Sequence, residues 1–263
     1  MPDDEEFLDR VVAKLAGLPG VTAIALGGSR AQGTHQADSD WDLGIYYRNT
    51  FDPQDLRDLG WSGEVFELGA WGGGIFNGGA WLQIDGRKVD VHYRDLAVIE
   101  RVIAEAEVGQ FTIEPLMFHL AGIPSYLLLA ELAFAQVLHG DLPRPTYPPE
   151  LQQQAATRWW NSADLLFGYA ETSSASSGRV TQCLGLLAQA TMMAAHAVMA
   201  AEGRWVTNEK RLLPDAGLSS VDDLLLDFGK APEDLASLIR STRNVCSSRL
   251  ATATNPDESH SRW

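Results

Sequence analysis

Two aspartates near the N-terminus have the residue type and spacing needed to hold a divalent cation. Asp40 and Asp42 stand two positions apart and alternate with the apolar residues Trp41 and Leu43. They begin an expected strand that runs as far as Tyr47. On a strand, side chains two positions apart point to the same face, so both carboxylates would lie on one side. Two neighbouring carboxylates repel each other unless a cation lies between them. The pair therefore predicts a metal site.

A glycine turn precedes this acidic pair. Gly27, Gly28 and Ser29 follow an apolar run over residues 21–26 that predicts a buried strand. Backbone N–H groups presented by such a turn bind phosphate. Arg30 comes next, and we expect it either to contact phosphate or to form a surface ion pair. A metal, a phosphate and paired carboxylates are the parts of a phosphoryl- or nucleotidyl-transfer site.

A third acid follows on a predicted hairpin. Residues 81–84 and 87–92 are two expected strands joined by Asp-Gly, a dipeptide typical of type I′ turns. The alternation of the second strand puts Lys88, Asp90 and His92 on one face. Asp90 is therefore a candidate partner of the acidic pair, and His92 is the histidine that we would test for a role beside it.

These residues together resemble the signature of the DNA polymerase beta-like nucleotidyltransferase superfamily. That signature is a Gly-Ser pair, a short spacer, an Asp-x-Asp strand and a third carboxylate on a later strand, which match Gly28-Ser29, Asp40, Asp42 and Asp90. The resemblance covers roughly the first hundred residues. It implies a nucleotidyltransferase that uses Mg²⁺, as one or two ions, and ATP or another nucleoside triphosphate.

The resemblance also implies a role for each residue. Asp40 and Asp42 would hold the metal, while Asp90 would be either a third metal ligand or the general base for the acceptor hydroxyl. Related antibiotic-modifying enzymes carry Glu at this position, and the shorter Asp leaves both roles open. Gly28 and Ser29 would bind the β- and γ-phosphates.

Two other phosphate-binding motifs are excluded by inspection. Gly28 to Gly33 has the outer spacing of a P-loop, but Thr34 and His35 stand where Lys and Ser or Thr are required. The dinucleotide fingerprint Gly-x-Gly-x-x-Gly is absent from the same segment. A Walker-type ATPase and a Rossmann dehydrogenase are therefore unsupported.

The character of the chain changes near its middle. Residues 1–115 mix strand and helix patterns, whereas residues 116–263 are rich in Leu and Ala with helical periodicity. We expect an α/β (α+β) fold, with a small mixed-sheet catalytic domain followed by an all-helical bundle. Superfamily members that modify antibiotics share this layout and bind the acceptor between the domains. An expected helix at 125–138 carries Glu131, a second candidate base.

A short segment of the second part resembles aminoglycoside adenylyltransferases. Residues 205–211 are similar to the segment that brings a lysine toward the triphosphate in those enzymes, and Lys210 would be that lysine. The alternative is that Lys210 and Arg211 begin an exposed helix.

A glycine-rich segment, residues 69–80, lies between the acidic pair and the predicted hairpin. It is either a flexible loop or a lid near the nucleotide, and its aromatic residues would then be available for stacking.

The net charge and the cysteine content limit the classes of partner and the cellular compartment that we expect. A formal net charge of −15 over 263 residues disfavours a long nucleic acid, because such binding depends mostly on Lys and Arg. An acidic surface favours a small cationic substrate, although it is also compatible with ordinary solubility. Two cysteines without C-x-x-C spacing and the lack of a signal-peptide pattern predict a cytoplasmic protein. The apolar run 185–201 carries polar residues, which favours a buried helix over a membrane span.

The expected activity follows from the resemblance and the charge. We expect transfer of a nucleoside monophosphate, AMP from ATP, to a hydroxyl of a small cationic molecule such as an aminoglycoside-type antibiotic, hence a role in antibiotic resistance. The alternatives are a nucleotidyltransferase that modifies a protein or tRNA in a toxin-type system, and a catalytically idle nucleotide-binding module. The sequence indicates neither the acceptor, nor the preferred base, nor the oligomeric state.

Overall fold

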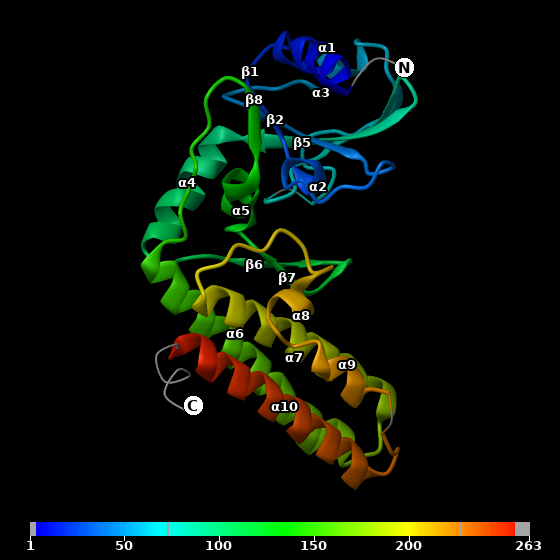
Figure 1. The fold of residues 1–263 in the computed structure, drawn as a ribbon, viewed down its shortest axis with the longest axis vertical. Coiled ribbons are helices and arrows are strands. Elements are labelled where there is room, and N and C mark those ends of the chain that lie inside the picture. Colours follow the sequence, from blue (N-terminus) through cyan, green and yellow to red (C-terminus); the bar gives the residue numbers. More distant parts are fainter. Residues whose placement is uncertain (1–3, 73, 227, 256–263) are drawn as a thin grey trace. The chain divides into compact units, whose positions relative to one another are not determined.

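The computed structural model describes residues 4–72, 74–226 and 228–255 (Figure 1). The chain divides into two compact units, Met1–Ala104 with Ser125–Thr146 and Glu105–Pro124 with Tyr147–Trp263. The first unit is thus discontinuous in sequence, because the chain returns to it after residue 124. The functional division into 1–115 and 116–263 stays a prediction.

A six-stranded mixed sheet forms the centre of the first unit. Its strand order is β3-β4-β5-β2-β1-β8, with β2 and β5 parallel and the other neighbours antiparallel. This arrangement confirms the predicted mixed sheet. The strands are β1 (Val21–Leu26), β2 (Trp41–Tyr47), β3 (Ser62–Val65), β4 (Gly79–Ile84), β5 (Arg87–Asp95) and β8 (Gln136–His139).

Helix α1 (Asp4–Ala16) covers one face of this sheet. Its apolar stripe, which includes Phe7, Val11 and Leu15, packs into the same core cluster as the inward side chains of the strands. Three acids in its first turn suit the positive end of the helix dipole. The other helices that begin in this unit are α2 (Gly28–Ala31), α3 (Pro53–Arg57), α4 (Leu96–Glu107) and α5 (Leu127–Phe134).

The predicted Asp-Gly hairpin is present between β4 and β5. Asp85 and Gly86 have φ angles of 49° and 78°, the left-handed conformation that a type I′ turn requires at both positions. The two-residue turn fixes the register, so Trp81 lies opposite Asp90.

The helix expected over 125–138 is only partly correct. Helix α5 ends at Phe134, and Ala135 is extended, with a ψ angle of 144°. The next residues form β8, which pairs with β1 through the Ile24–His139 and Ala25–Val137 positions. Leu-rich periodicity favoured a helix here, but the unpaired edge of β1 offers the backbone a ladder instead.

Helices dominate the second unit. Figure 1 shows α6, α7 and α10 running alongside one another. A two-stranded hairpin, β6–β7, was not expected in this part of the chain. The elements are β6 (Ile113–Leu116), β7 (His119–Pro124), α6 (Pro149–Tyr169), the π-helical turn η1 (Ala170–Ala175), α7 (Val180–Ala201), α8 (Leu212–Asp215), α9 (Ser220–Leu224) and α10 (Pro232–Thr254).

Helix α7 is apolar and long enough to cross a membrane by length and composition, and it is the one such helix within the described ranges. In its most apolar window 61% of the residues are buried inside the protein, as is usual for a core helix.

A buried ion pair links β5 to α5. The guanidinium of Arg94, only 3% exposed, donates to both carboxylate oxygens of Glu131 at 2.7 and 2.8 Å. Removing one partner of a buried pair leaves an uncompensated charge, so Glu131→Ala should lower the free energy of unfolding by about 3 kcal/mol. Urea denaturation measures this loss.

The matched control for this prediction is Glu100→Ala. It removes the partner of Arg48 from an ion pair in which both side chains are largely exposed, and stability should hardly change. Equal effects of the two substitutions would contradict the structural role of the Arg94–Glu131 pair. Because both oxygens of Glu131 are engaged by Arg94, the geometry also disfavours Glu131 as a catalytic base.

Candidate active site

A row of four side chains crosses the sheet on the face away from the core. Asp42 on β2 is paired with Asp90 on β5, Asp90 with Trp81 on β4, and Trp81 with Glu64 on β3. Residues paired across neighbouring strands point to the same face. The alternate residues, such as Leu43 and Val91, are buried in the core on the other face. The sheet therefore brings Asp42 and Asp90 together, although 47 residues lie between them in the sequence.

Asp40 lies one residue before β2 and completes the acidic group. Partial burial raises the pKa of Asp90, and the negative charge of Asp40 raises it further, while Lys88 acts in the opposite direction. Asp40 and Asp90 are thus close enough to repel each other. A bound cation would remove this repulsion.

Arg30 holds the backbone that carries Asp40. Its guanidinium donates to the carbonyl oxygen of Ser39 at 2.8 and 3.1 Å and to that of Asp40 at 3.2 Å. It also lies 4.0 Å from the centre of the Trp41 ring, and the side chain is 8% exposed. This geometry favours a positioning role for Arg30, and its contact with phosphate stays a prediction.

The glycine turn lies directly against Asp42. The N–H of Gly27 donates to the carbonyl oxygen of Asp42 at 2.8 Å, and Gly28 has a φ angle of +61°. A Cβ atom at Gly28 would lie 1.8 Å from Oδ2 of Asp42, so only glycine fits beside this carboxylate. Ser29 follows in the first turn of α2. The structure thus places both predicted phosphate-binding residues next to the acidic row.

Gly28→Ala should therefore impair the site more than the fold. The new methyl group would displace the Asp42 carboxylate, and we expect turnover to fall at least tenfold, equivalent to about 1.4 kcal/mol in the barrier. Steady-state kinetics of the purified variant measures this.

Gly33→Ala is the control for that substitution. Gly33 has a similar φ angle of +68°, but a Cβ atom added there would meet no atom within 4 Å. Both variants should lose a similar small amount of stability from backbone strain. If Gly33→Ala lost as much activity as Gly28→Ala, the close approach to Asp42 would not be the cause.

His92 lies on the same face of the sheet as Asp90, two residues further along β5. It is paired with Gly44 on β2 and with Gly79 on β4, and Trp71 meets it edge-on at 5.7 Å. Burial lowers the pKa of His92 to about 4, with a further contribution from Arg94. The imidazole is therefore neutral near pH 7, and its buried Nδ1 has no hydrogen-bond partner within the described part of the chain.

The structure shows a cluster of aromatic side chains beside the carboxylates, which the sequence analysis did not predict. Trp81 lies 4.8 Å from Phe66 and 5.8 Å from Trp71, measured between ring centres. Trp71 comes from the glycine-rich segment, in which Gly73 lies outside the described residues. The sequence did carry a usable signal, since a two-residue turn at 85–86 fixes the pairing of Trp81 with Asp90.

Lys210 lies in the second compact unit and is exposed. Its backbone N–H donates to Oδ1 of Asn208 at 3.0 Å. The preceding residue, Glu209, accepts from the N–H groups of Leu120 and Ala121 at 2.7 and 2.9 Å. Glu209 thus anchors this segment to β7, a role for which the sequence gave no signal, and the triphosphate contact of Lys210 stays a prediction.

The acidic row suits a metal that is shared with a substrate. In the described ranges, no three His, Cys, Asp or Glu side chains converge closely enough to form a complete metal cage. Mg²⁺ is usually held by one or two carboxylates together with substrate phosphates and water, rather than by an all-protein cage. The oxygen ligands of Asp42 and Asp90, with Asp40 beside them, fit that mode of binding.

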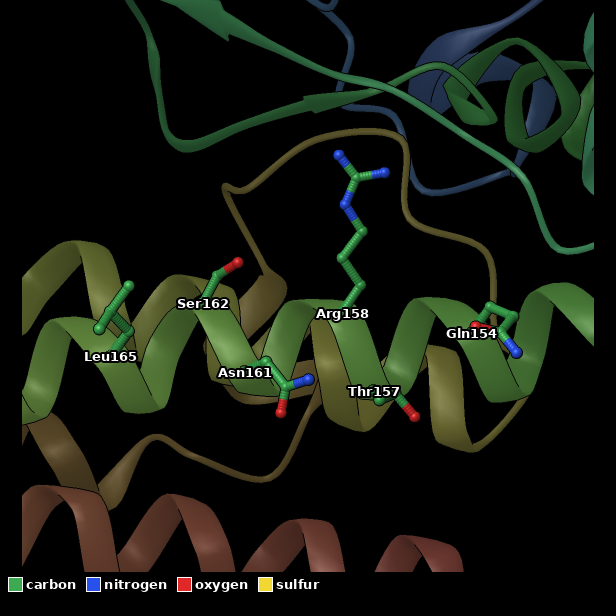
Figure 2. A pocket seen from close by; sticks show the side chains of 6 residues that line it. All are labelled: Gln154, Thr157, Arg158, Asn161, Ser162 and Leu165. Carbon is green, nitrogen blue, oxygen red and sulfur yellow. The ribbon is translucent and has the colours of Figure 1, made fainter.

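A surface hollow in the second unit has a different character. It is lined by one face of α6, from which Arg158 extends (Figure 2). The guanidinium of Arg158 is already engaged by the carbonyl oxygen and ring of Phe111. None of the predicted site residues line this hollow. The lining residues are Gln154, Thr157, Arg158, Asn161, Ser162 and Leu165.

Comparisons with known proteins agree with the geometry of the first unit. Residues 5–109 match a family model described as a nucleotidyltransferase domain, and this range contains the glycine turn and all three aspartates. The search of curated proteins gave no match.

Solved structures resemble the chain only distantly. A nucleotidyltransferase-like protein from Exiguobacterium sibiricum 255-15 aligns with a TM-score of 0.45 and 12% identity over 97% of this chain and 78% of its own. An aminoglycoside 6-adenyltransferase from Bacillus subtilis aligns with a TM-score of 0.28 and 10% identity, over 99% and 97%. The cyclic dinucleotide synthase CdnE from Elizabethkingia meningoseptica, solved with GTP and Apcpp, aligns with a TM-score of 0.27 and 11% identity. This alignment covers 91% of this chain and 90% of the synthase chain.

Proposed function

We propose that the protein is a nucleotidyltransferase of the polymerase beta-like superfamily and that it transfers AMP from ATP to a hydroxyl group of a small cationic acceptor. The match of residues 5–109 to a nucleotidyltransferase domain supports this proposal. The observation that carries the proposal is the Asp42–Asp90 pair beside the Gly28 turn. The two aspartates offer oxygen ligands for a divalent ion, and the neighbouring turn is suited to binding phosphate.

The proposed reaction is a displacement at the α-phosphorus. The acceptor oxygen forms a bond to that phosphorus, the bond to the bridging oxygen breaks, and pyrophosphate leaves. Gly28 and Ser29 bind the β- and γ-phosphates, which orients the leaving group. Such reactions depend mainly on positioning and on charge stabilisation.

The three aspartates divide the remaining work. Asp40 and Asp42 would hold Mg²⁺, and bound Mg²⁺ supplies charge neutralisation at the phosphate oxygens. Asp90 accepts the proton of the acceptor hydroxyl or serves as a further ligand. Its raised pKa is compatible with the first role, because a base must bind the proton that it removes.

The net charge of −15 supports a cationic acceptor. An acidic protein attracts positively charged molecules by long-range electrostatics and repels nucleic acid. An aminoglycoside-type antibiotic has the required ammonium and hydroxyl groups, and its modification would confer antibiotic resistance.

The test is transfer of label from α-labelled ATP to a panel of aminoglycosides, run beside bulk tRNA and cell-extract protein. The other three α-labelled nucleoside triphosphates test the preference for adenine. Labelled aminoglycoside formed with Mg²⁺ is the expected result. Label found only in tRNA or protein would overturn the small acceptor and favour a macromolecular target. ATP binding without any transfer would favour an idle module.

A further inference from the structure

The functional side chains follow one another across the sheet in an order that matches the order of groups in the proposed reaction. The strand order places the Gly28 turn after β1 at one end of the row, followed by Asp42 on β2, Asp90 on β5 and Trp81 on β4. Neighbouring strands are about 4.8 Å apart. The aromatic side chain is therefore separated from the phosphate-binding turn by both carboxylates.

This order matters because the attacking and leaving oxygens lie roughly in line in such a displacement. If pyrophosphate leaves toward Gly28, the acceptor approaches the α-phosphorus from the opposite side. Beyond Asp42 and Asp90, that side of the row is occupied by Trp81 and then by Glu64.

Trp81 has the properties of a binding platform. Its side chain is 53% exposed, which is unusual for an indole, yet Phe66 and Trp71 support it. The ring of Trp71 lies against the backbone of Gly79, where an added Cβ would meet it at 2.5 Å. An aromatic ring that is held in place but remains exposed can stack on a ligand at low entropic cost.

The charges around the platform select the ligand. Trp81 stands between Glu64 and Asp90 in the row, and Glu64 is exposed. An indole ring attracts cations through its π-face, and the exposed carboxylate of Glu64 adds to that attraction. A negatively charged ligand would be disfavoured at the same place.

We propose that Trp81 and Glu64 form the acceptor subsite, and that they bind a ring bearing ammonium groups, with the ring stacked on Trp81 and an ammonium group paired with Glu64. This inference rests on the proposed nucleotidyl transfer and adds the place and chemical class of the acceptor. Trp81 is thereby a specificity-determining residue rather than part of the metal or phosphate site.

The test uses 2-deoxystreptamine, a diamino ring, as the probe. Its dissociation constant is measured by ligand-observed NMR with Mg²⁺ and a non-hydrolysable ATP analogue present. Trp81→Ala should weaken probe binding about tenfold, equivalent to ~1.4 kcal/mol, and Trp81→Phe should retain most of it. Glu64→Gln should weaken binding and reduce its dependence on salt. The uncharged ring myo-inositol should bind the wild-type protein at least tenfold more weakly than the probe.

Two controls separate this inference from the proposed function. Phe118→Ala removes another exposed aromatic side chain, 83% exposed, and should leave probe binding unchanged. Affinity for the ATP analogue, measured in the same variants, reports on the nucleotide site alone and should not change.

Three results would overturn the subsite. In the first, Trp81→Ala weakens the ATP analogue and spares the probe, which would assign the indole to the nucleotide base. In the second, Trp81→Ala and Glu64→Gln leave the probe affinity at the wild-type value. In the third, the wild-type protein fails to bind the probe although it binds the ATP analogue, and nucleotidyl transfer itself would then still stand.

Discussion

Asp42→Ala is expected to abolish nucleotidyl transfer while the protein stays folded. Asp42 lies at the centre of the row, paired with Asp90 and in contact with the Gly28 turn. Its loss removes an oxygen ligand at the point where metal, triphosphate and base would meet. We expect turnover to fall by at least a thousandfold, which corresponds to about 4 kcal/mol in the barrier. Steady-state kinetics and circular dichroism of the purified variant measure both parts of this prediction.

Asp38→Ala provides the matched control, since it removes an exposed aspartate from the loop just before β2. This variant should keep wild-type turnover. Turnover of Asp42→Ala within about tenfold of wild type, or about 1.4 kcal/mol, would show that the metal-site assignment is wrong.

Asp90→Asn should separate the two roles of that residue. If Asp90 is chiefly the base, the chemical step should slow by about 10²–10⁴-fold while ATP binding survives. If it is chiefly a ligand, the affinity for Mg²⁺ should fall as well. Single-turnover kinetics together with metal titration distinguishes these results, and unchanged values in both would remove Asp90 from the site.

The raised pKa of Asp90 adds a pH dependence to this prediction. A base works only when it is deprotonated, so activity should decline as the pH falls through the raised pKa, and Asp90→Asn should lack this limb of the profile. For stability the sign is opposite. Because folding raises this pKa, ionised Asp90 destabilises the metal-free protein, and stability falls as the pH rises from the ordinary aspartate range through the raised value. Asp90→Asn should therefore be more stable than wild type near neutral pH without metal.

The sequence predicted the local features of the site well. The Asp-Gly turn fixed the β4–β5 register, and the alternation of β2 and β5 put the aspartates on one face, because both signals depend on neighbouring residues. The parallel pairing of β2 with β5 could not be derived in the same way, since 47 residues separate Asp42 from Asp90. The family resemblance supplied that link instead.

Other features of the fold and the site depend on contacts between residues that are distant in sequence, so no local sequence pattern predicts them. The strand β8 forms because the edge of β1 is available, and residues 136–139 alone resemble the end of a Leu-rich helix. Arg30 was expected at a phosphate or in a surface ion pair, and it forms an ion pair with Asp4 at 3.7 Å. Its hydrogen bonds to backbone carbonyls of the loop before β2 were not expected. The bidentate contact that engages Glu131 depends on Arg94, which is distant in sequence.

The central claim is that Asp42 and Asp90, with Asp40 beside them, hold a divalent metal that is shared with a nucleoside triphosphate. Titration calorimetry of the wild-type protein with ATP, in Mg²⁺ and in EDTA, tests it most directly. Without the metal the triphosphate would meet three carboxylates with nothing to offset their repulsion. We predict that ATP affinity falls at least tenfold in EDTA, equivalent to about 1.4 kcal/mol, whereas equal affinity under both conditions would contradict the account.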